Sequence, residues 1–159
     1  MNKILFMNCS PNRKGNTYRI GEKILEGRKY NILQMADYKI SQYGQVYEDD
    51  QIGEVFKEIE KADTLLIGAP VYWYTVGGIL KTFIDRLYML PEAEVLKGKK
   101  FYLFAQGSAP DEGTKNAIDF LANRVGTLMG MELKGVVTDT SDGNETVSYT
   151  HLTLPTILR

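Results

Sequence analysis

Apolar runs alternate with amphipathic segments along most of the chain. Five runs are apolar at nearly every position, which is typical of strands covered on both faces of a sheet. Between them, apolar residues recur at intervals of three and four, the spacing of a helix with one buried face. The strands are expected at residues 3–8, 30–35, 64–69, 100–106 and 133–137, and the helices near residues 16–28, 52–59, 76–87 and 118–129.

Local signals mark where several of these elements begin and end. Asp50 precedes the second helical segment and is expected to cap it, and Thr75 is expected to cap the third. Pro70 follows the third strand and is expected to end it, because proline lacks the N–H that a central strand donates.

The alternation of strand and helix predicts the fold class. Strands separated by helices of this length indicate an α/β fold with a parallel sheet and right-handed crossovers. The doubly wound order 2-1-3-4-5 is the arrangement we expect for five such strands. A fifth helix should follow Asp139 to cover the sheet, but the sequence beyond that point does not supply one. We therefore expect the natural protein to continue further.

Residues 147–159 do not match the pattern of the rest of the chain. The segment VSYTHLTLPT at residues 147–156 resembles a reading-frame translation of a widely used sequencing-library adapter, and the alternative is an ordinary C-terminal extension. We interpret residues 1–146 as a C-terminally truncated domain and residues 147–159 as a non-native tail. The chain's single histidine, His151, falls in this tail.

Composition narrows the classes of partner and compartment. The chain has 159 residues, a formal charge of -1 and a pI of about 5.9, so its charge does not favour nucleic acid or an anionic membrane. No apolar run approaches the roughly 18 residues that cross a bilayer. Cys9 is the only cysteine, which excludes an internal disulfide. These features favour a cytoplasmic protein without membrane or nucleic-acid partners.

The loop after the first strand, residues 10–17, is a candidate phosphate site. It joins a strand to a helix N-terminus, where free backbone N–H groups and the helix dipole favour an anion. Ser10 and Thr17 offer hydroxyls, Asn16 offers an amide, and Gly15 permits a close backbone approach. The spacing fits neither a Walker loop nor the dinucleotide pattern G-x-G-x-x-G, which leaves a single terminal phosphate. The alternative is an ordinary polar turn with a capping Asn or Thr.

Two further loops are expected at the same sheet edge, where open doubly wound sheets bind ligands. Residues 70–74 place the only tryptophan, Trp73, between two tyrosines, and a flat ligand would cover these rings. The alternative is that the rings pack against a neighbouring helix or a second subunit. The loop after the fourth strand contains Gly107 and Ser108 and suits backbone hydrogen bonds to a ring edge, or serves only as a connection.

Three segments together resemble a known family. They are Ser10-Pro11-x-x-x-Gly15-Asn16-Thr17, then Ala69-Pro70-Val71-Tyr72-Trp73, then GILKTFIDR at residues 78–86. In this order and spacing they look like the motifs of the NAD(P)H-dependent FMN reductases, which have the flavodoxin-like fold and include flavin, quinone and azo-dye reductases. The resemblance covers residues 3 to about 139.

The resemblance implies a cofactor, FMN, and two groups of residues that hold it. It implies that the phosphate is held by Ser10, Asn12, Gly15, Asn16 and Thr17. It also implies that the isoalloxazine ring is bordered by Pro70, Val71, Tyr72, Trp73, Gly107 and Ser108.

The resemblance further implies ping-pong hydride transfer from NADPH or NADH, through the flavin, to a small acceptor such as a quinone, free flavin or an azo compound. No catalytic side chain and no metal is expected, and relatives are commonly homodimers with the flavin near the interface. Arg13, Lys14 and Arg86 are candidates for contacting a nicotinamide phosphate, with a solvated surface role as the alternative for each. Some relatives hold an iron–sulfur cluster with cysteines after the second strand. Residues 37–49 contain none, so no cluster is expected, and Gly77 stands where relatives often have proline.

Two other functions remain as alternatives. A flavodoxin-type electron carrier would bind FMN in the same place without oxidising nicotinamide, although such carriers usually have a strongly acidic surface, unlike a chain of charge -1. A scaffold or dimerisation protein would bind no flavin. Hydrolytic sites that depend on histidine and zinc sites are excluded for residues 1–146, which contain no histidine.

Overall fold

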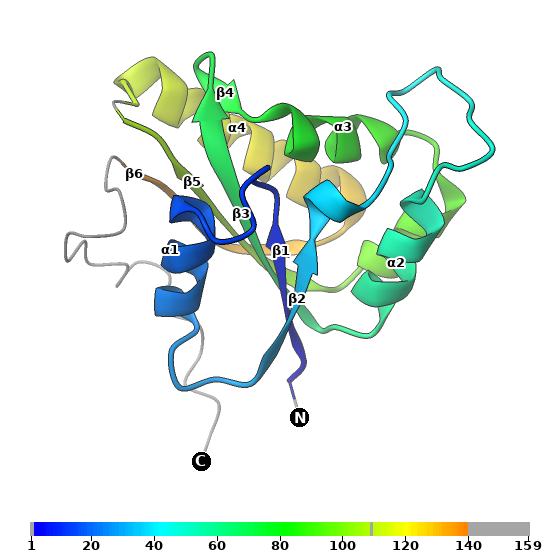
Figure 1. Ribbon diagram of the computed structural model, residues 1–159, viewed down its shortest axis with the longest axis horizontal. Coiled ribbons are helices and arrows are strands. Elements are labelled where there is room, and N and C mark those ends of the chain that lie inside the picture. The colour runs from blue at the N-terminus through cyan, green and yellow to red at the C-terminus, as the bar shows by residue number, and fades with distance from the viewer. Residues whose placement is uncertain (1, 109, 140–159) are drawn as a thin grey trace.

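The computed structural model describes residues 2–108 and 110–139, and its centre is a parallel sheet (Figure 1). The strands follow the order β2-β1-β3-β5-β6, and all neighbours on this path are parallel. This is the expected doubly wound order 2-1-3-4-5. The strand numbers differ only because the short strand β4, which pairs antiparallel to β3, was not among the five expected strands. The strands are β1 (Ile4–Asn8), β2 (Tyr30–Gln34), β3 (Thr64–Tyr72), β4 (Thr75–Val76), β5 (Lys100–Gln106) and β6 (Glu132–Asp139).

The helices occupy the amphipathic segments. They are α1 (Asn16–Ile24), α2 (Ile52–Glu60), α3 (Gly78–Arg86) and α4 (Glu112–Met129), with 3-10 turns η1 (Met35–Asp37) and η2 (Pro91–Leu96). The longest, α4, begins where the Asp111 side chain accepts a hydrogen bond from the Thr114 N–H at 2.7 Å, and it ends at Gly130 in the left-handed conformation. Helix α1 ends at Ile24, earlier than the expected residue 28.

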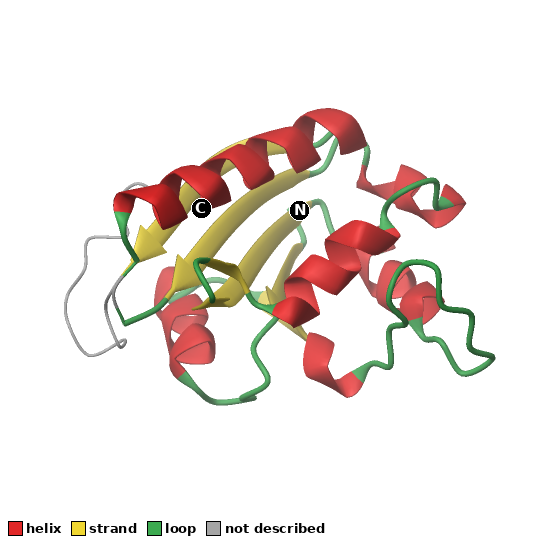
Figure 2. Ribbon diagram, turned by 90° about the horizontal axis from the view of Figure 1, so that it is seen from above, coloured by secondary structure: helices red, strands yellow, loops and turns green. Residues whose placement is uncertain are grey.

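The two faces of the sheet form two separate cores, because side chains alternate along each strand. Figure 2 shows helices on both faces of the twisted sheet. Phe6, Leu66 and Phe104 belong to the core that packs against α1. The larger core on the opposite face combines strand residues such as Met7 and Leu65 with residues from α2, α3, η2 and α4.

Two expectations about the middle of the chain are wrong. Pro70 does not end β3, which continues to Tyr72 because its last residues pair with β4; the Pro70 carbonyl accepts a hydrogen bond from Gly77 N–H at 2.9 Å. Thr75 caps no helix, because it lies in β4, and α3 begins after Gly77. Asp50 does act at the start of α2, where its carboxylate accepts the Ile52 N–H at 3.0 Å.

Some expectations concern residues that the structure does not describe. The missing fifth helix after Asp139 and the interpretation of residues 147–159 both fall outside the described ranges. Within those ranges, no helix combines the length and the apolar character needed to span a bilayer.

Candidate functional site

The ends of three neighbouring strands bring the predicted loops to one edge of the sheet. In the ladders, Asn8 of β1 lies beside Gly68 of β3, and Gly68 lies beside Phe104 of β5. Beyond β1, the Cys9 N–H donates to the Gly68 carbonyl at 2.8 Å. The loop that starts at Ser10 therefore leaves the sheet next to β3, at the point where ligands bind in doubly wound folds.

The first loop is held in a tight turn by its own polar groups. The Ser10 N–H donates to Oδ1 of Asn8 at 3.2 Å, and the Asn12 N–H donates to Oγ of Ser10 at 3.1 Å. The Gly15 N–H reaches the Asn12 carbonyl at 3.5 Å. A side chain on Gly15 would crowd this turn, since its Cβ would lie 2.9 Å from Cβ of Asn12. These contacts fix the backbone conformation of the turn from Ser10 to Gly15, directly before α1.

The N-terminus of α1 offers unpaired polar groups. Gly15 occupies the N-cap position, so no side chain caps the helix. Thr17 is fully buried, and its hydroxyl has no hydrogen-bond partner among the residues described. Leaving a buried hydroxyl unpaired costs about 1–3 kcal/mol. An anion bound at this helix end would satisfy both the hydroxyl and the free backbone N–H groups. Asn16, by contrast, uses its Oδ1 to accept a hydrogen bond from Arg19.

The β3–β4 hairpin presents three exposed aromatic residues. The exposed fraction is 47% for Tyr72, 91% for Trp73 and 69% for Tyr74. Trp73 and Tyr74 both have positive φ angles, 48° and 64°, the pattern of a type I′ turn that Asn and Gly normally occupy. Such backbone strain, about 1–3 kcal/mol for each residue, concentrates at binding sites. Packing of these rings against a second subunit remains a prediction.

A cleft of about 270 Å³ joins this hairpin to the loop after β5. The Cβ of a side chain at Gly107 would lie 2.9 Å from Cβ of Val71, so the loop after β5 is in direct contact with the end of β3 that forms the hairpin. The cleft is lined by Val71, Trp73, Tyr74, Gly107, Ser108, Pro110 and Thr114. The structure therefore brings four of the predicted ring-bordering residues together.

The remaining predicted residues lie beside the cleft rather than in its lining. Pro70 is buried in β3, and the Tyr72 ring lies against Gly77, where a Cβ would come 3.1 Å from Cδ2 of the tyrosine. Gly77 thus provides the space for this ring. The predicted phosphate residues occupy the neighbouring loop, which adjoins β3 through Thr17: a Cβ on Gly68 would lie 2.9 Å from its Cγ2. Pro110 belongs to the loop after the fourth predicted strand, which the sequence already singles out. Thr114 was not predicted, because only the fold places the start of α4 opposite the hairpin.

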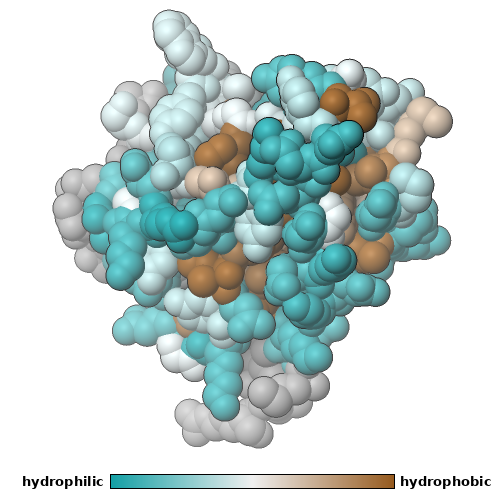
Figure 3. Space-filling model, turned by 45° about the vertical axis from the view of Figure 1, so that its right-hand side comes forward, coloured by the Kyte–Doolittle hydropathy of each residue, from teal (hydrophilic) through white to brown (hydrophobic). Residues whose placement is uncertain are grey.

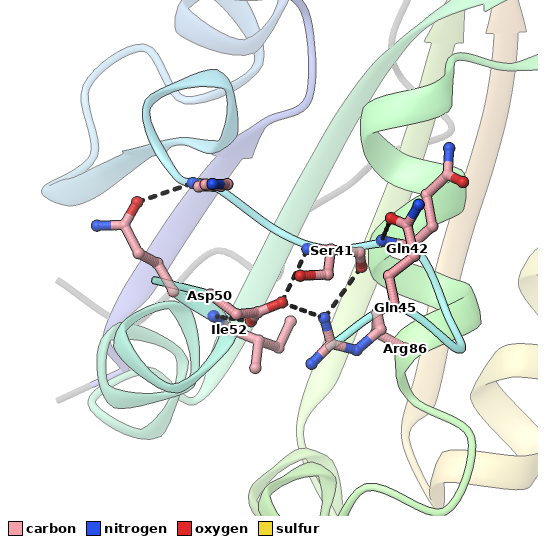
Figure 4. A network of polar contacts seen from close by, with 8 residues as sticks. Ser41, Gln42, Gln45, Asp50, Ile52 and Arg86 are labelled. Atoms are coloured by element: carbon pink, nitrogen blue, oxygen red, sulfur yellow. Dashed lines mark hydrogen bonds and ion pairs between the residues drawn. The ribbon is translucent and has the colours of Figure 1, made fainter. Parts of the chain in front are cut away.

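Arg86, a candidate for nicotinamide binding, has a structural role (Figure 4). Its guanidinium donates to the Asp50 carboxylate at 2.5 Å and to the Ser41 carbonyl at 3.0 Å, and both charged side chains are mostly buried. Burial alone would raise the pKa of Asp50, but hydrogen bonds from Arg86, Ser41 and Ile52 outweigh it and hold this pKa below the ordinary value of 3.8. These contacts join Ser41 and Asp50, at the two ends of the loop before α2, to the last residue of α3.

Arg13, within the first loop, and Cys9, just before it, both have structural surroundings that explain them. Arg13 forms an ion pair with Asp37 of η1. Cys9 is buried, and this burial raises the pKa of its thiol to about 12, so the thiolate is not formed at neutral pH. Among the described residues, no group of three His, Cys, Asp or Glu side chains is placed to hold a metal ion.

The sheet order, the helices on both faces and the polar turn at the switch point define a flavodoxin-like α/β protein. The chain belongs to the NADPH-dependent FMN reductase family, which it matches over residues 2–136. The resemblance drawn from its motifs is thereby confirmed.

Known proteins similar to this chain include flavoproteins and a quinone reductase. The iron-sulfur flavoprotein of Archaeoglobus fulgidus is 34% identical over 100 residues, covering 55% of this chain and 49% of that protein. The FMN-dependent NADH:quinone oxidoreductase of Herminiimonas arsenicoxydans is 33% identical over 84 residues, covering 46% of this chain and 41% of that protein. The Trp repressor binding protein from Bacillus subtilis shares the fold, with a TM-score of 0.68 and 24% identity over 87% of both chains. The chain spans about half the length of the curated relatives it matches.

Proposed function

We propose that this protein binds FMN and oxidises NADPH or NADH, passing reducing equivalents to a small acceptor. The observation that carries the proposal is the buried, unpaired hydroxyl of Thr17 at the uncapped start of α1, on the same edge of the sheet as an aromatic cleft. One half of this arrangement suits a phosphate and the other suits a flat ring. Family membership supports the same assignment.

The phosphate would be held by the first loop, through Ser10, Asn12, Gly15, Asn16 and Thr17. The Ser10 hydroxyl oxygen already accepts the Asn12 N–H, so its own hydrogen remains available to an anion. The Thr17 hydroxyl has no partner among the described residues, so it can both donate and accept, and the helix dipole adds a favourable field for an anion. No arginine or lysine is required, because hydroxyls and backbone N–H groups provide the donors.

The ring would be bordered by Pro70, Val71, Tyr72, Trp73, Gly107 and Ser108. Bound FMN would supply the redox chemistry, accepting hydride from the nicotinamide and delivering it to the acceptor. The exposed rings of Tyr72 and Trp73 would shape the stacking face and keep water from it. Gly107 would let the backbone of the β5 loop approach the ring edge, since its position against Val71 leaves no room for a side chain.

The acceptor we propose is a quinone, free flavin or an azo compound. The relative from Herminiimonas is named a quinone oxidoreductase, which supports the first choice. Iron–sulfur clusters are held by several cysteine thiolates, whereas this chain has one buried cysteine, so the proposal includes no cluster despite the name of the Archaeoglobus relative.

Steady-state oxidation of NADPH and of NADH, with FMN and a soluble quinone present, tests the proposal. We expect turnover that depends on both FMN and the quinone. Flavin binding without nicotinamide oxidation would instead identify a flavodoxin-type carrier. Protein that stays colourless after incubation with FMN and gel filtration would identify a scaffold that binds no flavin.

We also propose that the protein forms a homodimer. A groove of about 460 Å³ between α3 and α4 is lined largely by apolar side chains, and Tyr88 and Leu128 at its rim are more than half exposed. On the face shown in Figure 3, apolar side chains gather in separate patches among hydrophilic ones.

Light scattering tests the dimer. It should give the mass of a dimer for the wild type and the mass of a monomer for Leu128→Glu. Phe120→Glu, on the same helix but outside the groove lining, should leave the mass unchanged; a monomeric wild type contradicts the proposal.

A further inference from the structure

Asn8, the last residue of β1, is fully buried, and both polar atoms of its side-chain amide are hydrogen-bonded. Its Oδ1 accepts the Ser10 N–H at 3.2 Å, and its Nδ2 donates to Oε1 of Gln34 at 2.8 Å. A buried amide with both polar atoms paired fixes its orientation, because rotating the side chain would break both bonds. Asn8 therefore holds the first residue of the loop in one position.

Gln34 extends this contact from β2 to the far side of the same loop. Its Oε1 accepts from Asn8, while its Nε2 donates to the Arg13 carbonyl at 3.5 Å. The Arg13 side chain in turn pairs with Asp37, three residues beyond Gln34. Two points of the loop, Ser10 and Arg13, are thus connected to the end of β2 through one chain of side-chain amides.

The loop held in this way contains the donors assigned to the phosphate under the proposed function, on which this inference rests. We infer that Asn8 and Gln34 are positioning residues for the phosphate: they touch no ligand, but they orient the backbone N–H groups and the Ser10 hydroxyl that do. A neutral amide is suited to this position. An aspartate there would keep one acceptor for the Ser10 N–H, but it would lose the donor toward Gln34 and place a negative charge beneath an anion site.

The test compares FMN with riboflavin, which has the same ring and no phosphate. For Asn8→Asp we expect the dissociation constant for FMN to rise about tenfold or more, because the new negative charge repels the phosphate. A tenfold rise corresponds to about 1.4 kcal/mol of binding free energy. For Gln34→Met, which keeps the side-chain volume, we expect a rise of severalfold. The dissociation constant for riboflavin should stay unchanged in both variants. Asn31→Asp, which adds the same charge at an exposed position of β2, is the matched control and should leave both constants unchanged.

A second readout needs no ligand. In Asn8→Ala, the backbone amides of Ser10 and Asn12 should exchange hydrogen faster than in the wild type, while amides of β3 keep their protection. Equal weakening of FMN and riboflavin, or no weakening of FMN, would overturn the inference while leaving the proposed function intact. A wild type that binds neither flavin would overturn both.

Discussion

The backbone N–H of Cys9 donates a 2.8 Å hydrogen bond to the carbonyl oxygen of Gly68, joining the turn after β1 to the centre of β3. The loop that is proposed to hold the phosphate begins at Ser10, one residue after Cys9, and β3 ends in the aromatic hairpin at Tyr72, four residues after Gly68. This bond continues the parallel β1–β3 ladder, so the two halves of the proposed flavin site start from neighbouring strands.

Gly68→Ala should disturb both the core and the site. The new methyl group would lie 2.3 Å from Cζ of Phe104 and 2.9 Å from Cγ2 of Thr17, so the two side chains must move. Overpacking of this kind costs about 1–3 kcal/mol. Urea unfolding should show this loss, and FMN binding should weaken. Gly53→Ala, in α2 with no atom near the new methyl, is the control and should be neutral or slightly stabilising.

Replacing Trp73-Tyr74 with Asn-Gly should make the protein more stable and less able to bind flavin. Asn and Gly accept positive φ readily, so the substitution relieves the backbone strain of the hairpin. The two rings that are lost are largely exposed, so little buried apolar surface is lost with them. A gain of 1 kcal/mol corresponds to roughly 2–4 °C in melting temperature for a chain of this size. Trp73→Phe, which keeps an aromatic ring, should preserve binding. An unchanged melting temperature, or undiminished flavin affinity, would contradict this account of the hairpin.

Asp50→Asn should destabilise the protein by about 3 kcal/mol at neutral pH, because Arg86 is left without its charged partner in a mostly buried position. Asp49→Asn is the matched control: its pair with Lys39 is exposed and screened by solvent, so the loss of stability should be much smaller than for Asp50→Asn. Unfolding by urea at several pH values measures both.

The Asp50 contribution should also depend on pH. The pKa of Asp50 is depressed in the folded state, so its stabilising effect is complete above the unfolded-state pKa of about 3.9 and is lost as the pH falls further, toward the folded-state value. The difference in unfolding free energy between wild type and Asp50→Asn should therefore shrink below pH 4. A difference that stays constant between pH 7 and pH 3 would show that the carboxylate charge is not responsible.

Cys9 should resist alkylation in the folded protein. Its thiol is buried and its pKa is raised to about 12, so iodoacetamide at pH 8 should modify it only when the protein is unfolded in urea. Mass spectrometry after timed quenching measures the rate. Rapid modification of the native protein would mean that the end of β1 opens locally.

The sequence predicts the framework well because each strand is apolar on both faces and each helix on one. The order of the sheet and the positions of Thr17 and Trp73 at one edge follow from that pattern. The β3–β4 hairpin could not be predicted, since Trp73 and Tyr74 occupy a turn whose usual signature is Asn or Gly. The pair formed by Arg86 and Asp50, 36 residues apart, is equally invisible in the sequence, because tertiary packing alone brings the two together.

The central claim is that one edge of the sheet holds a phosphate and the ring attached to it. Titration of the wild type with FMN and with riboflavin, followed by flavin fluorescence, tests it most directly. We predict that both ligands bind and that FMN binds at least tenfold more tightly, since only FMN engages the loop from Ser10 to Thr17. Equal affinity for the two ligands, or binding of neither, would contradict the claim.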